Sequence, residues 1–167
     1  MGVPRGLIRT DGARLNGVAQ LRWDNAGNML VPDGNSLIRR ITMPGRTGGG
    51  GFHPVVPTRV LDSRTTTGGW NAPLAAGAPR PLTVTGVAGV PASASAVIMN
   101  VTVTASTAGS FLTVYPTGAA LPNASNINFA AGQTLPNLVT VKVGAGGAVT
   151  IANAVGSTHV VADLVGW

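Results

Sequence analysis

The chain has 167 residues, a net charge of +6, and neither Cys nor Glu. Without Cys, disulfides and thiolate metal sites are excluded. Gly and Pro together make up more than a fifth of the residues, a density that helical proteins avoid because Pro breaks helices and Gly weakens them. The composition therefore favours an all-β protein of short strands joined by many turns.

The first zone, residues 1–47, contains short apolar pieces separated by turn signals. Residues 18–23 and 29–31 flank a stretch, 24–28, that favours a hairpin turn, and a second turn is predicted at 32–35. Too few apolar residues are present to build a core, so we expect an extended arm that gains order on a partner or on neighbouring copies. The start lacks an apolar run, and we expect no ordinary secretion signal there.

The arm carries most of the charge. Residues 1–51 hold seven Arg and three Asp, a net charge of +4. These arginines are dispersed rather than gathered in a block, which argues against nucleic-acid binding. We expect them to pair with acidic groups on a particle surface, because the guanidinium fork binds carboxylates with two hydrogen bonds. The anchoring candidates are Arg5, Arg9, Arg14, Arg22, Trp23, Arg39 and Arg40. A solvated, partly disordered leader is the alternative.

Four consecutive glycines, residues 48–51, predict a flexible linker and a boundary, after which residues 52–167 form the globular domain. Strict alternation in residues 97–104 places Val97, Met99, Val101 and Val103 on one face of a strand. Seven further runs have the length of strands: 56–61, 82–85, 111–115, 126–129, 138–143, 148–152 and 159–164. About eight short strands at near-regular spacing predict a β-sandwich or jelly-roll-like domain.

The domain is poor in charge, since beyond Arg80 only Lys142 and Asp163 are charged. Such a surface suits packing against copies of itself, and we expect a homo-oligomer, with a trimer favoured. No stretch reaches the ~18 apolar residues that a membrane helix needs, so no membrane partner is expected.

Catalytic arrangements are weakly indicated. His159 and Asp163 lie four residues apart, so on one strand they would share a face, and Ser63 could complete a triad. The surroundings of Ser63, however, lack the Gly-x-Ser-x-Gly pattern of a nucleophile elbow. Asp62 and Asp163 could form a glycosidase pair, but nothing in the sequence sets their separation. We predict no catalytic residue and no enzyme.

The charged residues of the domain are better explained as structural. We expect ion pairs among Arg59, Asp62, Arg64 and Asp163 that fix the ends of strands, because a carboxylate in so apolar a strand needs a partner. The two histidines cannot complete a zinc site without carboxylates, and no loop has the dense Asp spacing of a calcium site. No metal or cofactor is predicted.

Glycan contact is the main functional alternative for the domain. Sugars stack on aromatic rings and hydrogen-bond to amides, and the candidates are Trp70, Asn71, Tyr115 and Asn126. The favoured alternative is that Tyr115 belongs to the core and that the Asn residues cap turns.

An ordered series of motifs runs through most of residues 52–167: FHP (52–54), PTRVLDSR (57–64), GVPA (89–92), AVIMNVTVT (96–104), LTVYP (112–116), PNASNINF (122–129), AGQTLPNLV (131–139) and HVVADLVGW (159–167). This series resembles a β module of secreted and surface proteins of actinobacteria and of virion proteins of their phages. The resemblance implies surface display, with wall or glycan contact, and no reaction.

The layout of arm, linker and outward β domain is similar to that of phage capsid decoration proteins, head fibres and minor tail proteins. We therefore expect a structural virion accessory protein of the capsid decoration or head-fibre type at the virion surface. Its partner would be the major capsid or tail protein, and its β domain would contact the host surface. The alternatives are a cell-wall or glycan-binding module of a bacterial surface protein, and a minor tail or receptor-binding protein.

Overall fold

The computed structural model describes residues 22–23, 29–33, 37–41 and 51–167. The chain divides into two compact units, Met1–Gly51 and Phe52–Trp167. The described residues form β-strands and turns, with one short 3-10 helix, η1 (Ala145–Gly147), and no α-helix among them. The predicted all-β class is confirmed.

The first unit contains a three-stranded antiparallel sheet of β1 (Arg22–Trp23), β2 (Met29–Asp33) and β3 (Leu37–Ile41), in that order. The predicted hairpin is present as the pairing of β1 with β2, while its turn residues 24–28 lie outside the described residues. The described residues of the predicted arm form this sheet, and its role as an anchoring arm stays a prediction. The three short strands pair antiparallel and satisfy part of one another's backbone hydrogen-bonding groups.

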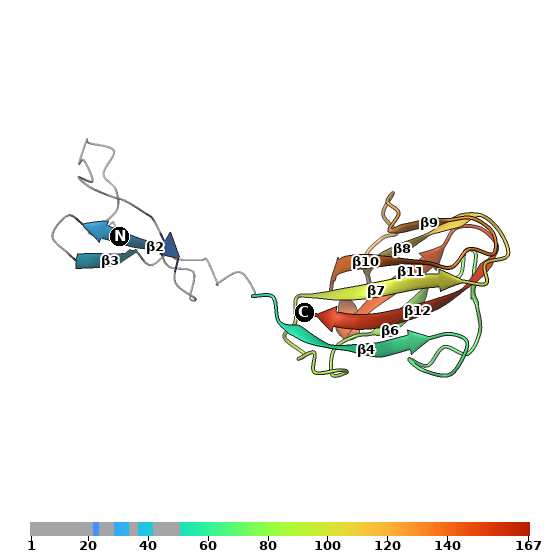
Figure 1. The fold of residues 1–167 in the computed structure, drawn as a ribbon, viewed down its shortest axis with the longest axis horizontal. Coiled ribbons are helices and arrows are strands. Elements are labelled where there is room, and N and C mark those ends of the chain that lie inside the picture. The colour runs from blue at the N-terminus through green and yellow to red at the C-terminus, as the bar shows by residue number, and fades with distance from the viewer. Residues whose placement is uncertain (1–21, 24–28, 34–36, 42–50) are drawn as a thin grey trace. The chain divides into compact units, whose positions relative to one another are not determined.

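The second unit is a sandwich of two antiparallel sheets, which Figure 1 shows as two layers. The first sheet has the order β10 (Leu135–Lys142), β7 (Ala96–Thr104), β12 (Ser157–Gly166) and β4 (Pro54–Asp62), with β5 (Leu74–Ala75) also pairing with β12. The second has the order β6 (Arg80–Thr83), β11 (Ala148–Asn153), β8 (Ser110–Pro116) and β9 (Ile127–Phe129). The predicted β-sandwich is therefore confirmed.

The core lies between the two sheets. In β7 the residues Val97, Met99, Val101 and Val103 are fully buried, while the residues between them are half-buried. The predicted alternation is confirmed, because β7 lies between β10 and β12 and turns one face inward. Burial of each such side chain contributes roughly 1.5–3 kcal/mol to folding.

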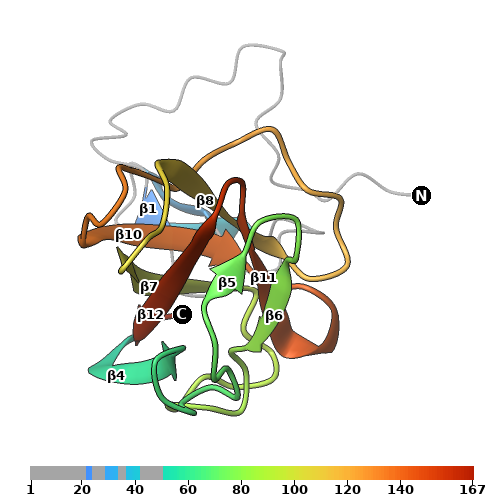
Figure 2. The same cartoon turned by 90° about the vertical axis from the view of Figure 1, so that its right-hand side faces the viewer.

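One edge of the sandwich is closed by the two-residue strand β5, which the sequence did not predict. It pairs with the start of β12, and the adjacent Ala76 forms a bridge with Asn153 at the end of β11. Figure 2 shows β5 between the strands β12 and β11, which belong to different sheets. The buried side chain of Leu74 extends the core to this edge.

The beginning of the unit is fastened to its end. His53 and Trp167 exchange two backbone hydrogen bonds, of 2.8 and 3.1 Å, and their rings stack with centroids 4.0 Å apart. Phe52 packs against Gly166, where a Cβ would collide with its ring. Figure 1 shows the C-terminus beside the start of β4. We call these four residues the terminal clasp.

Candidate functional site

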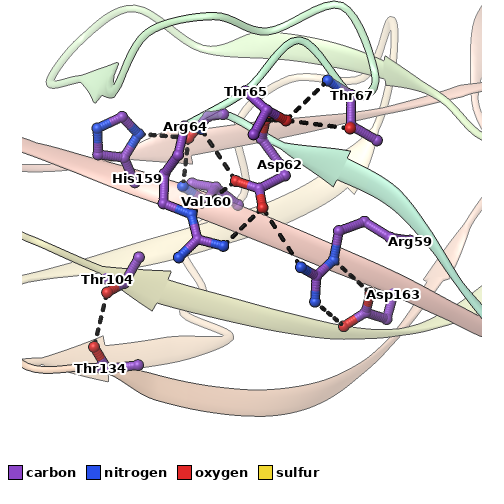
Figure 3. A network of polar contacts seen from close by, with 11 residues as sticks. Arg59, Asp62, Arg64, Thr65, Thr67, Thr104, Thr134, His159, Val160 and Asp163 are labelled. Carbon is purple, nitrogen blue, oxygen red and sulfur yellow. Dashed lines mark hydrogen bonds and ion pairs between the residues drawn. The ribbon is translucent and has the colours of Figure 1, made fainter.

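A network of charged and hydroxyl side chains lies where β4 ends against β12, and Figure 3 shows it from close by. Asp62 is the last residue of β4 and stands opposite Val161, while Arg59 stands opposite Asp163. Because β4 is the edge strand of its sheet, Arg59 on it and Arg64 just beyond its end both reach the carboxylates and remain about half exposed.

Asp62 is the centre of this network. Arg64 donates from Nε to Oδ1 at 2.8 Å and from Nη2 to Oδ2 at 2.7 Å, and its backbone N–H donates to Oδ1 at 3.1 Å. Arg59 adds a longer contact from Nη1 to Oδ2 at 3.4 Å. The hydrogen bonds from the Arg64 side chain hold the pKa of the Asp62 carboxyl far below its usual value, although burial opposes them.

Arg59 links the two carboxylates of the unit. Its Nε donates to Oδ1 of Asp163 at 2.9 Å and its Nη2 donates to Oδ2 at 3.2 Å. Hydrogen bonding to Asp163 raises the pKa of Arg59. The structure therefore joins all four residues of the predicted ion pairs. A register shift between Ala162 and Asp163 places Asp163 opposite Arg59.

Ser63 and His159 approach each other beside this network. The Oγ of Ser63 lies 2.9 Å from Nδ1 of His159 and accepts the backbone N–H of Val160 at 2.9 Å. Since Oγ is the acceptor there, the Ser63 hydroxyl hydrogen is free to donate to His159. Ser63 is fully buried.

This geometry does not form a Ser-His-Asp triad. A triad places the imidazole between serine and carboxylate and leaves the serine open to substrate. Here the Asp163 carboxylate is bound by Arg59, and Ser63 is enclosed. A glycosidase acid needs a raised pKa, whereas the pKa of Asp62 is lowered. The arrangement fixes the end of β4 against β12.

The predicted glycan contacts do not come together as one site. Trp70 is 3% exposed, its Nε1 donates to the carbonyl oxygen of Pro81 at 3.1 Å, and the Arg80 guanidinium lies 4.5 Å from its ring centre. Trp70 therefore offers no free face for a sugar, and its prediction as a stacking platform is wrong. The tight turn before it, with Gly68 at φ +76° against the carbonyl of Val60, directs the indole into the core.

Tyr115 is also buried, at 7% exposed, which agrees with the favoured alternative to sugar contact. The side-chain Oδ1 of Asn126 accepts the backbone N–H of Val114 at 2.7 Å, which gives this amide a structural role. Of the four candidates only Asn71 is exposed.

The anchoring candidates lie in the first unit. Arg22 and Trp23 form β1, and Arg39 and Arg40 belong to β3. Arg5, Arg9 and Arg14 lie outside the described residues. In the register of the sheet, the positions of Arg22 and Arg40 both stand opposite that of Leu30, so three strands contribute to one row.

Two of the hollows on the surface of the sandwich have similar volumes. One, of about 610 Å³, runs between the edge strands β4 and β6, and Arg59, Trp70 and Arg80 are among its lining residues. The other, of about 590 Å³, lies on β8 and β9 under residues 121–125, and we call it the β8–β9 groove. Sequence reasoning did not name Phe111, although its exposed position, one residue before the buried Leu112, follows from strand alternation.

In the described part of the chain, no group of three or more His and Asp residues is close enough to hold a metal ion. Among the residues that the structure describes, no helix has the length and apolar character needed to cross a membrane. Comparison with known proteins found no matching family model, no matching curated protein and no matching solved structure.

Proposed function

We propose that this chain is a structural accessory protein of a phage virion, of the capsid decoration or head-fibre type. Its first unit attaches it to a major capsid or tail protein at the virion surface, and its β-sandwich is displayed. The observation that carries the proposal is the division of the chain at Gly51 and Phe52 into two compact units, each with its own sheets.

The chemistry of the two units supports different tasks. The first unit holds seven of the eleven basic residues of the chain, and arginine suits the recognition of acidic protein surfaces. The sandwich uses its charges internally, because both its aspartates are bound by arginines. Its buried polar side chains in the described part all have hydrogen-bond partners, as expected of a durable scaffold.

The motif series and the layout described above add the virion context. The charged groups at the strand ends of the sandwich pair with one another, which suits a displayed structural domain better than a catalytic one. Its sparse surface charge also favours packing between copies, so the proposal includes a homo-oligomer, with a trimer favoured.

Deletion of residues 1–47 tests the proposal. Phage particles that naturally carry the protein are prepared with either the full chain or the deletion variant, and both are separated on a density gradient. The full chain should sediment with particles and the deletion variant should stay at the top. Asp163→Asn, a change in the sandwich, is the matched control and should sediment like the full chain.

A second variant separates attachment from gross loss of structure. Arg39→Glu combined with Arg40→Glu reverses two charges in β3 and should weaken sedimentation with particles. If the deletion variant still joins particles, the attachment role of the first unit is wrong. If the deletion variant does not join particles but binds purified bacterial wall as well as the full chain does, the alternative of a wall-binding surface module gains support.

A further inference from the structure

The β8–β9 groove lies on the outer face of the second sheet. In β8 the side chains of Leu112 and Val114 point into the core, so Phe111 and Thr113 point outward. Phe111 stands directly opposite Asn128 of β9. An aromatic ring and an amide thus lie side by side as cross-strand neighbours, about 5 Å apart at Cβ.

The wall of the groove opposite the strands is the segment 121–125, which hydrogen bonds hold in place. Thr113 Oγ1 donates to the carbonyl oxygen of Ala124 at 2.6 Å, and the backbone N–H of Asn126 donates to the carbonyl oxygen of Leu112 at 2.8 Å. The Asn137 side chain donates to the carbonyl of Asn126 at 2.6 Å. The groove is therefore preformed, and a ligand would lose little affinity to ordering of the protein.

The lining combines apolar surface with polar groups that are free to bind. Phe111 and Leu121 are 40% and 60% exposed. Asn128 Nδ2 donates to Ser125 Oγ at 3.1 Å, which leaves Asn128 Oδ1 as an acceptor and the Ser125 hydroxyl hydrogen as a donor. The exposed side chain of Asn123 makes no hydrogen bond to any described residue and adds a further amide.

None of the eight residues that line the groove is ionisable. The groove therefore offers no charged partner, and it suits a neutral ligand with an apolar face for Phe111 and hydroxyl or amide groups for Asn123, Ser125 and Asn128. A pyranose ring has this combination, with C–H bonds on one face and hydroxyls at its edge. The other hollow, between β4 and β6, includes Arg59 and Arg80 and has its indole buried, so it lacks these features.

We infer that the β8–β9 groove is a binding site for a neutral saccharide. The ring of Phe111 would stack on the sugar, and the amides of Asn123 and Asn128 would bind its hydroxyls. The inference goes beyond the proposed function and does not depend on how the first unit attaches. It also replaces the buried rings of Trp70 and Tyr115 with residues that a sugar can reach.

The test is a titration of the full-length, ¹⁵N-labelled chain, followed by NMR. The probes are tetrasaccharides of glucose, galactose, mannose and N-acetylglucosamine, with tetragalacturonate as the acidic comparison. At least one neutral probe should shift the amide signals of β8, β9 and residues 121–125 in a saturable way. Phe111→Ala should weaken that binding about tenfold or more, because one stacked ring contributes on the order of 1.4 kcal/mol.

Two further variants sharpen the test. Asn128→Ala removes the amide that would bind sugar hydroxyls, and it should weaken neutral-sugar binding too. Leu138→Ala removes an apolar side chain of the other sheet that is more exposed than Phe111, and it should leave binding unchanged. The inference is overturned if no neutral probe shifts the groove, if the shifts map elsewhere, or if Phe111→Ala binds like the original chain. It is also overturned if Phe111→Ala changes only the oligomeric state, which would make the groove a contact between copies.

Discussion

At the scale of single residues, Asp62 determines how the end of β4 is held. It is 5% exposed and receives three hydrogen bonds from Arg64 and one from Arg59. Asp62→Asn should lower the free energy of unfolding by about 1–3 kcal/mol at neutral pH, because charge-assisted hydrogen bonds are lost. Chemical denaturation followed by circular dichroism measures this loss. Asp163→Asn, whose carboxylate is more exposed, should cost less than about 1 kcal/mol.

The pH dependence of this loss has a definite sign. The folded-state pKa of Asp62 lies below its unfolded value of about 3.9. Its stabilising contribution is therefore complete above that value and is lost as the pH falls toward the folded-state pKa. The difference in unfolding free energy between the original chain and Asp62→Asn should be constant between about pH 5 and 7. It should shrink below about pH 4, and a difference that instead grows on acidification would contradict this assignment.

Ser63 makes a second prediction at this scale. Ser63→Ala leaves the buried backbone N–H of Val160 without its acceptor and should cost about 1–3 kcal/mol. Denaturant midpoints measure the change, and Ser93→Ala, at an exposed position, should stay within about 0.5 kcal/mol of the original chain. Equal effects of the two substitutions would show that the Ser63 contact contributes nothing.

Residue identity alone predicts some of these contacts and not others. The ion pairs of Arg59 and Arg64 could be predicted because the unit has only two carboxylates to share among four basic residues. The burial of Trp70 could not be predicted, since its partners, the carbonyl of Pro81 and the Arg80 guanidinium, become neighbours only when the edges of the two sheets meet. A glycine-rich neighbourhood suggests an exposed loop, yet here it makes the tight turn that buries the ring.

At the scale of elements, strand positions follow from alternation and turn residues, whereas strand order does not. All eight runs predicted in the sandwich overlap observed strands. The two-residue strand β5 is too short to show a period. The place of β12 between β7 and β4 depends on partners far apart in the sequence, which local patterns do not encode.

The terminal clasp gives the prediction for this scale. Trp167 packs on the core and stacks on His53, so it holds the first residues of β4 against the end of β12. Trp167→Ala should destabilise the sandwich by about 1–2 kcal/mol, measured by chemical denaturation. Val155→Ala is the control, because Val155 is 52% exposed just before β12 begins. A Trp167→Ala variant as stable as this control would show that the backbone pairing alone closes the unit.

At the scale of the whole molecule, the order of the strands makes the sandwich depend on its last segment. Pairing of β4 with β12 joins Arg59 to Asp163, which are 104 residues apart, and β12 is also the partner of β7. Such long-range pairing is slow to form compared with local hairpins. The sandwich therefore becomes complete only when the final strand is in place, and the clasp then fixes both ends together.

The division into two units leads to the last prediction. The hydrophobic core described in the second unit includes residues from Val55 to Trp167. A chain limited to residues 52–167 should therefore unfold cooperatively with a midpoint within about 3 °C of that of the sandwich in the full chain. Calorimetry of both chains measures this. A much lower midpoint would mean that the first unit stabilises the sandwich directly, and the deletion of residues 1–47 would then remove stability as well as attachment.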